Sequence, residues 1–289
     1  MAKNNYLLLL IFALYILNNM NMQKTIFITG ASSGLGKATA KLFQSKGWNV
    51  IATMRNPERE TELTKLENVT LLSLDVTNWE QIKDVVAKAN DLKNIDVVFN
   101  NAGYGLMGAL EALSDEQIVR QINTNLLGVM RITKAFIPYF RKKKNGLFIT
   151  TTSIGGSLAF PLHSVYQATK FGLEGWSESL SFELSLHNIG IKTIAPGAIA
   201  TNFTGRSLDK SSHAEYQELE EKLFGNVDEM MNAASAPEQI ADIIYEAATD
   251  GKDQIRYIAG TDAENMFQTR TQMGSEEFRK LIRKQFVGH

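Results

Sequence analysis

Lys24-Thr-Ile-Phe-Ile-Thr29, which runs into Gly30-Ala-Ser-Ser-Gly34-Leu-Gly36, is the stretch that decides the fold of this chain. Its first part predicts a short buried strand, and residues 37–46 show the pattern of a helix that Gly47 closes. Glycines between a strand and a helix let the backbone approach a pyrophosphate, while the free N–H groups of the helix N-terminus face the anion. The spacing is Gly-x-x-x-Gly-x-Gly rather than the commoner Gly-x-Gly-x-x-Gly. The stretch therefore predicts a dinucleotide site after the first strand.

The alternation of strand and helix continues through most of the chain. Further strands are expected at 48–53, 69–74, 95–99, 146–152, 190–195 and 254–259, and helices at about 78–90, 114–125, 128–144, 171–186, 237–249 and 276–286. We therefore expect an α/β fold, a single doubly wound Rossmann domain over residues 23–289 with about seven parallel strands flanked by helices. Ligands bind beyond the carboxyl ends of such strands, so Gly30, Asp75 and Asn100 should converge on one crevice.

Local signals mark where two of these helices begin and where one is interrupted. Asn78 is expected to cap its helix, and Ser114 with Gln117 three residues later has the pattern of a capping box. Pro138 lies inside the helix expected at 128–144 and predicts a kink there.

Composition and charge exclude several classes of protein. The chain has 289 residues, and 30 basic against 31 acidic residues give a net charge of −1, which argues against a nucleic-acid-binding protein. It contains no cysteine, so disulfides, thiolate nucleophiles and cysteine-ligated zinc are excluded. Its 4 histidines lack His-x-x-x-His spacing, and we expect no metal site.

Segments at two places fall outside the regular pattern. Residues 6–17 form a continuous apolar run within an N-terminal segment, 1–22, that is short for a bilayer span and is followed by no small-residue cleavage site. This segment is a membrane anchor, a degenerate signal, or upstream sequence with true initiation at Met20 or Met22, of which we favour the third. Residues 198–235 are polar and weakly periodic, and we expect a substrate lid there that carries a short helix at 214–224.

The stretch Tyr166-Gln-Ala-Thr-Lys170 carries a pattern typical of proton-transfer chemistry. A tyrosine and a lysine at this spacing lie on one face of a helix, and apolar residues over 171–186 predict that helix. An ammonium group near a phenol favours the phenolate, so we expect the pKa of Tyr166 to fall toward working pH, which would make it a proton donor or acceptor for an oxygen. The alternative is an ordinary amphipathic helix with a surface lysine.

The end of the second expected strand indicates which dinucleotide is bound. Folds that bind NAD usually place a carboxylate there for the ribose 2′-hydroxyl. This chain instead has Thr53-Met54-Arg55-Asn56, and Arg55 could bind a 2′-phosphate, which favours NADP(H) over NAD. The alternative is that Arg55 is a surface residue that opens the helix at Pro57.

Taken together, the motifs follow one another in a recognisable order. They are Thr29-Gly30-x-x-x-Gly34-x-Gly36, Asn100-Asn101-Ala102-Gly103, Asn125, Ser153, Tyr166-x-x-x-Lys170, and Pro196-Gly197 followed by Thr201. This set resembles the short-chain dehydrogenase/reductase family, of the compact single-domain type, and the resemblance covers residues from about 24 to about 260. Arg55 resembles the NADP-preferring members, whereas the tail after about residue 262 is variable in that family.

The resemblance implies a catalytic set of Asn125, Ser153, Tyr166 and Lys170. Tyr166 would be the general acid in carbonyl reduction or the base in alcohol oxidation. Lys170 would lower the pKa of that phenol and hold the nicotinamide ribose, and Ser153 would hydrogen-bond the substrate oxygen. Asn125 would hold a water that links Lys170 to bulk solvent.

The resemblance also implies the residues that hold NADP(H). Gly30, Ser33, Gly34 and Leu35 would cradle the pyrophosphate, Asp75 and Val76 would flank the adenine, Asn101 the ribose and Thr201 the carboxamide. The remaining residues expected at the cofactor are Ser32, Gly36, Arg55, Ala102, Gly103, Tyr166, Lys170, Pro196, Gly197 and Ile199.

The expected function is that of an NADP(H)-dependent oxidoreductase that transfers a hydride between nicotinamide and a carbonyl or secondary alcohol. An apolar substrate pocket would be lined by Tyr104, Leu106, Leu158, Phe160 and Phe203, while His163 is expected in a solvent-exposed loop. Two alternatives are an NADP(H)-binding sensor without chemistry, and a dehydratase or epimerase, for whose longer substrate domain the chain has no room. By analogy with the family we expect a homodimer or homotetramer, cytoplasmic unless residues 6–17 are a membrane anchor.

Overall fold

The computed structural model describes residues 23–201, 208–225 and 234–288. The expected N-terminal segment 1–22, the pocket residue Phe203 and part of the expected lid lie outside these ranges. Within them, no helix is both long enough and apolar enough to cross a membrane.

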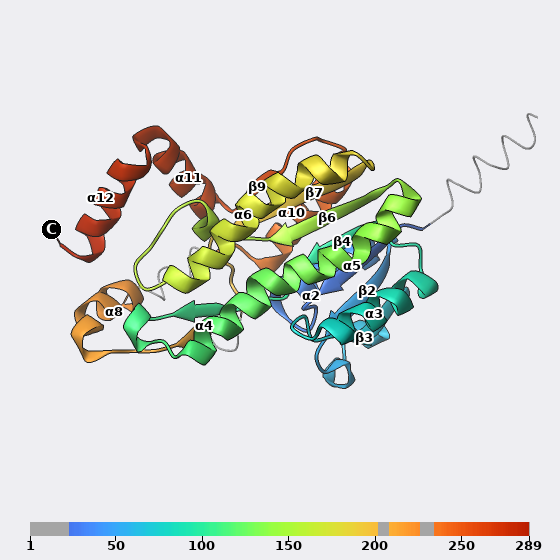
Figure 1. Ribbon diagram of the computed structural model, residues 1–289, viewed down its shortest axis with the longest axis horizontal. Helices are drawn as coiled ribbons and strands as arrows, with labels where there is room; N and C mark the ends of the chain where they lie inside the picture. Colours follow the sequence, from blue (N-terminus) through green and yellow to red (C-terminus); the bar gives the residue numbers. More distant parts are fainter. Residues whose placement is uncertain (1–22, 202–207, 226–233, 289) are drawn as a thin grey trace, which may run out of the picture.

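A sheet of seven strands, all parallel to their neighbours, forms the centre of the molecule, in the order β3-β2-β1-β4-β6-β7-β9 (Figure 1). The strands are β1 (Thr25–Thr29), β2 (Asn49–Met54), β3 (Val69–Ser73), β4 (Val97–Asn100), β6 (Gly146–Thr151), β7 (Ile189–Pro196) and β9 (Arg256–Ala259). The chain builds outward from β1 to β3, then crosses back to β4 and builds the other half. The doubly wound α/β fold is therefore confirmed, and the crevice between β1 and β4 is its switch point.

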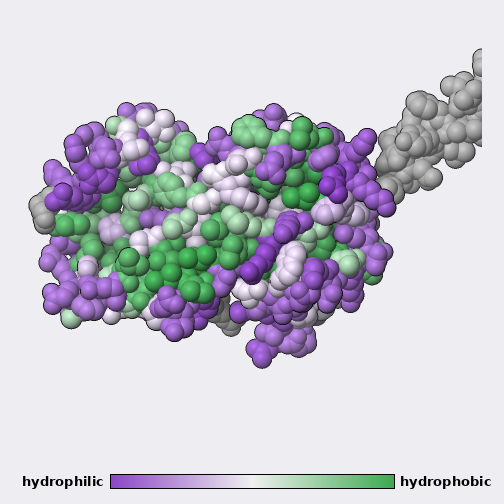
Figure 2. All heavy atoms as spheres, viewed as in Figure 1, coloured by the Kyte–Doolittle hydropathy of each residue, from purple (hydrophilic) through white to green (hydrophobic). Residues whose placement is uncertain are grey.

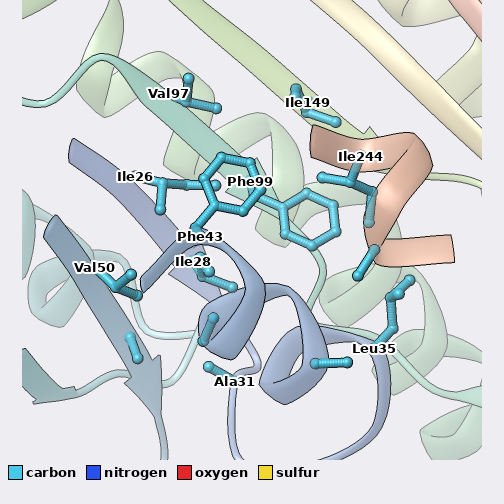
Figure 3. Close-up of a cluster of buried hydrophobic side chains, with 14 of the residues drawn as sticks. Ile26, Ile28, Ala31, Leu35, Phe43, Val50, Val97, Phe99, Ile149 and Ile244 are labelled. Carbon is cyan, nitrogen blue, oxygen red and sulfur yellow. The ribbon is translucent and has the colours of Figure 1, made fainter. Parts of the chain in front are cut away.

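Helices cover both faces of this sheet (Figure 1). On one face lie α2 (Gly34–Ser45) and α10 (Pro237–Thr249), and on the other α3 (Trp79–Leu92), α5 (Gly128–Lys143) and α6 (Ser164–Ser185). Because successive side chains of a strand point to opposite faces, Ile26 and Ile28 pack toward α2 and α10, whereas Phe27 packs toward α5. Figure 3 shows the first of these cores, where Phe43 of α2 meets Phe99 and Ile244.

The remaining elements gather near the carboxyl ends of the strands and at the C-terminus. They are α4 (Asp115–Ile122), a π-helical segment (Asn123–Leu127), a small parallel sheet of β5 (Gly105–Met107) and β8 (Leu208–Lys210), α8 (Gln217–Phe224), α11 (Thr261–Met273) and α12 (Ser275–Phe286). Short 3-10 turns occur at Pro57–Arg59, Leu63–Lys65, Leu110–Ala112, Ile154–Gly156 and Ala214–Tyr216. The short helix expected at 214–224 is present as the last of these turns followed by α8.

The helix starts follow the capping signals. Asn78 accepts the N–H of Gln81, and Ser114 and Gln117 form the reciprocal capping box at α4. Pro138 lies inside α5, as expected. The helix that carries the Tyr-x-x-x-Lys motif begins at Ser164, so Tyr166 and Lys170 both lie in its first turns.

Candidate active site

The carboxyl ends of β1 and β4 are tied together directly. The hydroxyl oxygen of Thr29 accepts the backbone N–H groups of Asn101 and Ala102 at 2.9 and 3.1 Å. The side-chain amide of Asn101 donates in turn to the carbonyls of Thr29 and Gly30. A side chain at Gly30 would place its Cβ 2.7 Å from Ala102 Cα, and the φ of +69° also favours glycine there. Gly30 and the residues after β4 therefore lie together, which is one part of the expected convergence of Gly30, Asp75 and Asn100.

The glycine-rich turn leaves the N-terminus of α2 open to an anion. Ser33 is the N-cap of α2 but makes no side-chain capping bond, and the first turn holds no acidic residue. Gly36 packs so closely that a Cβ would lie 2.3 Å from the carbonyl oxygen of Gly30. Leu35 is buried in the core, so it could meet a ligand only through its backbone. Unpaired N–H groups at a helix start fit a phosphate, whereas a nearby carboxylate would repel one.

The residues that follow β2 and β3 differ in whether their side chains already have partners within the protein. Arg55 is exposed just after β2, and its guanidinium makes no ion pair or hydrogen bond with any residue that the structure describes. Asp75, after β3, accepts the N–H and the hydroxyl of Thr77, so one carboxylate oxygen is already engaged locally. Val76 is buried against Gly128.

Ser153, Tyr166 and Lys170 come together at the carboxyl end of β6. The side chains of Ser153 and Tyr166 are hydrogen-bonded to each other, and Ser153 Oγ also accepts the N–H of Gly155 at 3.0 Å. The ammonium of Lys170 lies 5.7 Å from the centre of the Tyr166 ring and donates to the carbonyl oxygen of Thr151 at 2.9 Å. The structure thus brings three of the four expected catalytic side chains into one cluster.

The protonation of this cluster differs from the expectation that Lys170 lowers the pKa of Tyr166. Burial raises the pKa of the Tyr166 phenol, and only the hydrogen bond with Ser153 opposes that shift. Burial also lowers the pKa of Lys170 to about 8, although the charge of Glu174 acts in the other direction. The expectation is therefore wrong for the chain by itself, because the effect of burial on the phenol outweighs that of the hydrogen bond with Ser153.

Asn125, the fourth expected catalytic residue, lies in the π-helical segment and is 1% exposed. Its Oδ1 accepts the N–H of Tyr104 at 3.1 Å, and its Nδ2 donates to the Tyr104 carbonyl at 2.8 Å. The side-chain amide is therefore engaged with the turn that follows Gly103. A water held by Asn125 would need its main-chain carbonyl, which a π-helical segment can leave without an intrahelical partner.

The loop after β7 completes the set of expected cofactor residues. Thr201 lies beside the glycine-rich turn, since a Cβ at Gly34 would be 3.4 Å from Thr201 Cγ2. The N–H of Ala198 donates to the carboxylate of Asp262 at 2.8 Å, and Ile199 forms a bridge with Ser235. Asp262 was missed from the sequence because it belongs to α11, in the tail beyond the motifs.

The expected pocket residues differ in their exposure. Leu106 and Leu158 are fully buried, and Leu158 packs in a cluster with Phe278 of α12. Tyr104 and Phe160 remain partly exposed. His163 is not the solvent-exposed loop residue that was expected. It is partly buried, it contacts the carbonyl of Pro161 at 2.6 Å, its ring lies 6.5 Å from that of Tyr166, and burial lowers its pKa.

Other residues that shape the site left little signal in the sequence. Thr151 acts through its backbone carbonyl, which any residue would supply. Glu174 is a buried carboxylate one helical turn beyond Lys170, in a pattern that looks like an ordinary charged helix position. Within the described residues, no group of three or more histidines, aspartates or glutamates is placed to hold a metal ion.

Comparison with known proteins defines the class. A doubly wound sheet with a glycine-rich turn and a Ser-Tyr-Lys cluster is the arrangement of short-chain dehydrogenases, and a model of the short chain dehydrogenase family matches residues 24–212. The chain belongs to this family of oxidoreductases.

Individual relatives span most of the chain. An uncharacterised oxidoreductase of Schizosaccharomyces pombe is 38% identical over 233 residues, 80% of this chain and 99% of that protein. A 3-ketodihydrosphingosine reductase of Bacteroides thetaiotaomicron is 39% identical over 180 residues, 62% of this chain and 65% of that protein.

Solved structures show the same fold. A short-chain dehydrogenase from Streptomyces avermitilis has a TM-score of 0.79 at 30% identity and covers 91% of this chain and 98% of its own. ElxO, solved with NADP bound, has a TM-score of 0.71 at 26% identity and covers 84% of this chain and 100% of its own.

Proposed function

We propose that the chain is an NADP(H)-dependent oxidoreductase that transfers a hydride between nicotinamide and a carbonyl or secondary alcohol, with Tyr166 as the acid or base. The observation that carries this proposal is the hydrogen-bonded pair of Ser153 and Tyr166 with the ammonium of Lys170 over the phenol ring. A sensor that only binds a nucleotide has no need of such a set. The cluster lies at the carboxyl end of β6, beside the switch point where ligands of this fold bind.

The residues present fit NADP(H). The open N-terminus of α2 and the tight glycine turn suit a pyrophosphate, and the guanidinium of Arg55, which pairs with none of the described residues, suits a 2′-phosphate. ElxO, which shares the fold, was solved with NADP bound. When bound, this cofactor supplies or accepts the hydride. Asn101, Thr201 and the residues expected around them would hold it at the crevice.

The side chains of the cluster would handle the proton and the charge on the substrate oxygen. A phenol whose pKa is raised stays protonated at neutral pH, so Tyr166 is ready to donate a proton to an oxygen during carbonyl reduction. Ser153 would donate a hydrogen bond to the same oxygen and stabilise the charge that develops there. Lys170, with a pKa of about 8, is mostly cationic at neutral pH and would favour the phenolate left after proton transfer.

The substrate that these residues favour is a ketone carried on an apolar molecule. Tyr104 and Phe160, two of the expected pocket residues, are partly exposed. Phe160 packs against the apolar side chains of Leu158 and Phe278. Two relatives are named as reductases of 3-keto compounds, the 3-ketodihydrosphingosine reductase and a 3-oxoacyl-[acyl-carrier-protein] reductase of Thermotoga maritima. Apolar 3-keto compounds therefore belong at the head of a substrate panel.

Tyr166→Phe is the experiment that tests the proposal. The variant keeps the ring but removes the hydroxyl, so turnover of NADPH with the best carbonyl of the panel should fall roughly a thousandfold while NADPH binding is retained. Tyr139→Phe is the matched control, because Tyr139 lies on α5 and its hydroxyl donates to Asn94 in the loop between α3 and β4, away from the cluster. Wild-type turnover by Tyr166→Phe would refute the role of Tyr166. NADPH binding by the wild type without turnover of any carbonyl or alcohol would indicate the sensor instead.

A further inference from the structure

A buried carboxylate lies one helical turn beyond Lys170. Glu174 is 4% exposed and accepts three side-chain hydrogen bonds, from Thr152 Oγ1 at 2.5 Å, Thr193 Oγ1 at 3.1 Å and Arg256 Nε at 2.8 Å. Carboxylates are seldom buried unless they are paired and hydrogen-bonded, and here both conditions are met. The donors come from the end of β6 and from β7 and β9, so a single side chain of α6 joins three strands.

The partners of Glu174 are neighbours of the reactive cluster. Thr152 lies between Thr151, whose carbonyl accepts the ammonium of Lys170, and Ser153, which is hydrogen-bonded to Tyr166. By fixing Thr152, Glu174 therefore also fixes the two neighbouring residues through which β6 contacts Lys170 and Tyr166.

The backbone after Ser153 is fixed against α6 as well. A Cβ at Gly156 would lie 2.9 Å from the carbonyl oxygen of Lys170 and 3.1 Å from Glu174 Cγ. The turn Ile154–Gly156 thus touches α6 at the same two residues. The separation between the strand end that carries Ser153 and the helix that carries Tyr166 is set at this contact.

We propose that Glu174, paired with Arg256, is a positioning residue that locks α6 to the end of β6 and so keeps the ammonium of Lys170 over the ring of Tyr166. The proposal rests on the proposed function, since it assigns Tyr166 and Lys170 to the reaction. The ion pair with Arg256 offsets the cost of burying the carboxylate of Glu174.

The charge of Glu174 acts on Lys170 in a definite direction. Burial lowers the pKa of Lys170 to about 8, and Glu174 opposes this shift. On its own helix Lys170 also faces the phenol of Tyr166, with His163 beyond that ring. Thr151 and Ser153 of the strand end do not titrate, and Arg256 of β9 reaches the site through Glu174. Removal of the carboxylate charge should therefore lower the pKa of Lys170, so that the ammonium is lost at a lower pH.

The test is the pH profile of kcat for carbonyl reduction by the full chain at saturating NADPH. In Glu174→Gln the alkaline limb should move toward lower pH by roughly one unit, as expected for one buried charge at close range. The matched control is Glu178→Gln, since Glu178 lies on the same helix one turn further and is exposed, and its profile should superimpose on that of the wild type. A Glu174→Gln profile that also superimposes on the wild type would overturn the proposal.

A double variant covers the case in which Glu174→Gln does not fold. Glu174→Gln with Arg256→Gln leaves neither charge unpaired, and its alkaline limb should shift in the same direction by less, because the nearer charge dominates. An unshifted limb would again overturn the proposal. Tyr166→Phe, measured in parallel, separates the two claims. If it retains turnover, the proposed function fails, whereas if it is inactive and Glu174→Gln is unshifted, only the role of Glu174 fails.

Discussion

At the residue scale, two helical glycines differ in the space around them. A Cβ on Gly36 would lie 2.3 Å from the Gly30 carbonyl and 2.5 Å from Asn101 Nδ2. A Cβ on Gly175 would meet no atom of the described residues within 4 Å, apart from the neighbouring backbone of its own helix. The first position needs glycine for close packing between the turn and α2. The second does not, since a helix interior favours alanine by roughly 0.5–1 kcal/mol.

The same substitution should therefore have opposite effects at the two sites. Gly36→Ala should lower the free energy of unfolding by about 1–3 kcal/mol, as overpacked positions do, and weaken NADPH binding because the turn is displaced. Gly175→Ala should raise the free energy of unfolding by up to about 1 kcal/mol and leave binding unchanged. Urea unfolding measures the free energy of unfolding of each variant, and an NADPH fluorescence titration measures its cofactor binding. Equal stability of the two variants would contradict the packing argument.

Arg55 offers a test of cofactor choice at the scale of one side chain. Its guanidinium is exposed without a described partner, so replacement costs no internal contact. Arg55→Asp should raise the Kd for NADPH at least about tenfold, through loss of a charge-assisted contact and repulsion of the phosphate, and should improve NADH binding. The control is Arg59→Asp, since Arg59 has an 81% exposed side chain whose nearest carboxylate lies 4.0 Å away. An unchanged NADPH/NADH ratio in Arg55→Asp would remove the argument for NADP(H).

At the element scale, the sequence predicts what depends on local pattern. The strand β1, the turn and α2 follow from buried residues, glycines and a helical period within one short stretch, and the cap at Asn78 follows from a single side chain. The elements β5 and β8 were not predicted. Each is a three-residue strand that exists only because the other, far away along the chain, lies beside it. The helix α11 was also missed, because its residues lack a strong apolar period.

The candidate site shows the same division. The motif positions Ser153, Tyr166 and Lys170 could be named from the sequence because each has a reactive side chain at a recognisable spacing. Their environment could not, since burial and the direction of the lysine ammonium depend on tertiary packing. This is why the pKa of Tyr166 was expected to fall and is instead raised. The contributions of Thr151 through its carbonyl and of Asp262 from α11 are invisible for the same reason.

At the scale of the whole molecule, one face carries a group of apolar residues on its surface. Figure 2 shows apolar residues gathered over the region where α4 and α6 lie side by side. Val119 of α4 and Phe171 of α6 are both exposed there. The homodimer or homotetramer expected by analogy with the family would bury such a face, and sedimentation of the full chain would test that expectation. The cytoplasmic location and the nature of residues 1–22 stay predictions.

The molecule is also held together at the side of the sheet opposite β3 by a buried ionic network. Lys192 of β7 donates to Asp250 Oδ1 at 2.6 Å, and the hydroxyl of Tyr257 on β9 donates to Asp250 Oδ2 at 2.6 Å. Burial alone would raise the pKa of Asp250, but these donors hold it at about 2. Because Asp250 follows α10 directly, the network joins that helix to two strands.

The stabilising contribution of this network should therefore be lost in a defined range of acidic pH. A carboxylate with a lowered pKa in the folded state stabilises the fold above its unfolded pKa of about 3.9, and this contribution is lost as the pH falls toward 2. The network should contribute about 2 kcal/mol to the free energy of unfolding at neutral pH. In Asp250→Asn, urea unfolding at neutral pH should show a free energy of unfolding lower by about 3 kcal/mol, because Lys192 is left buried without its partner. The further decrease of this free energy between about pH 5 and about pH 2 should be smaller than in the wild type. The exposed Asp253→Asn serves as the control, with stability and slope close to those of the wild type. An equal acid slope in Asp250→Asn and the wild type would show that the network does not govern acid stability.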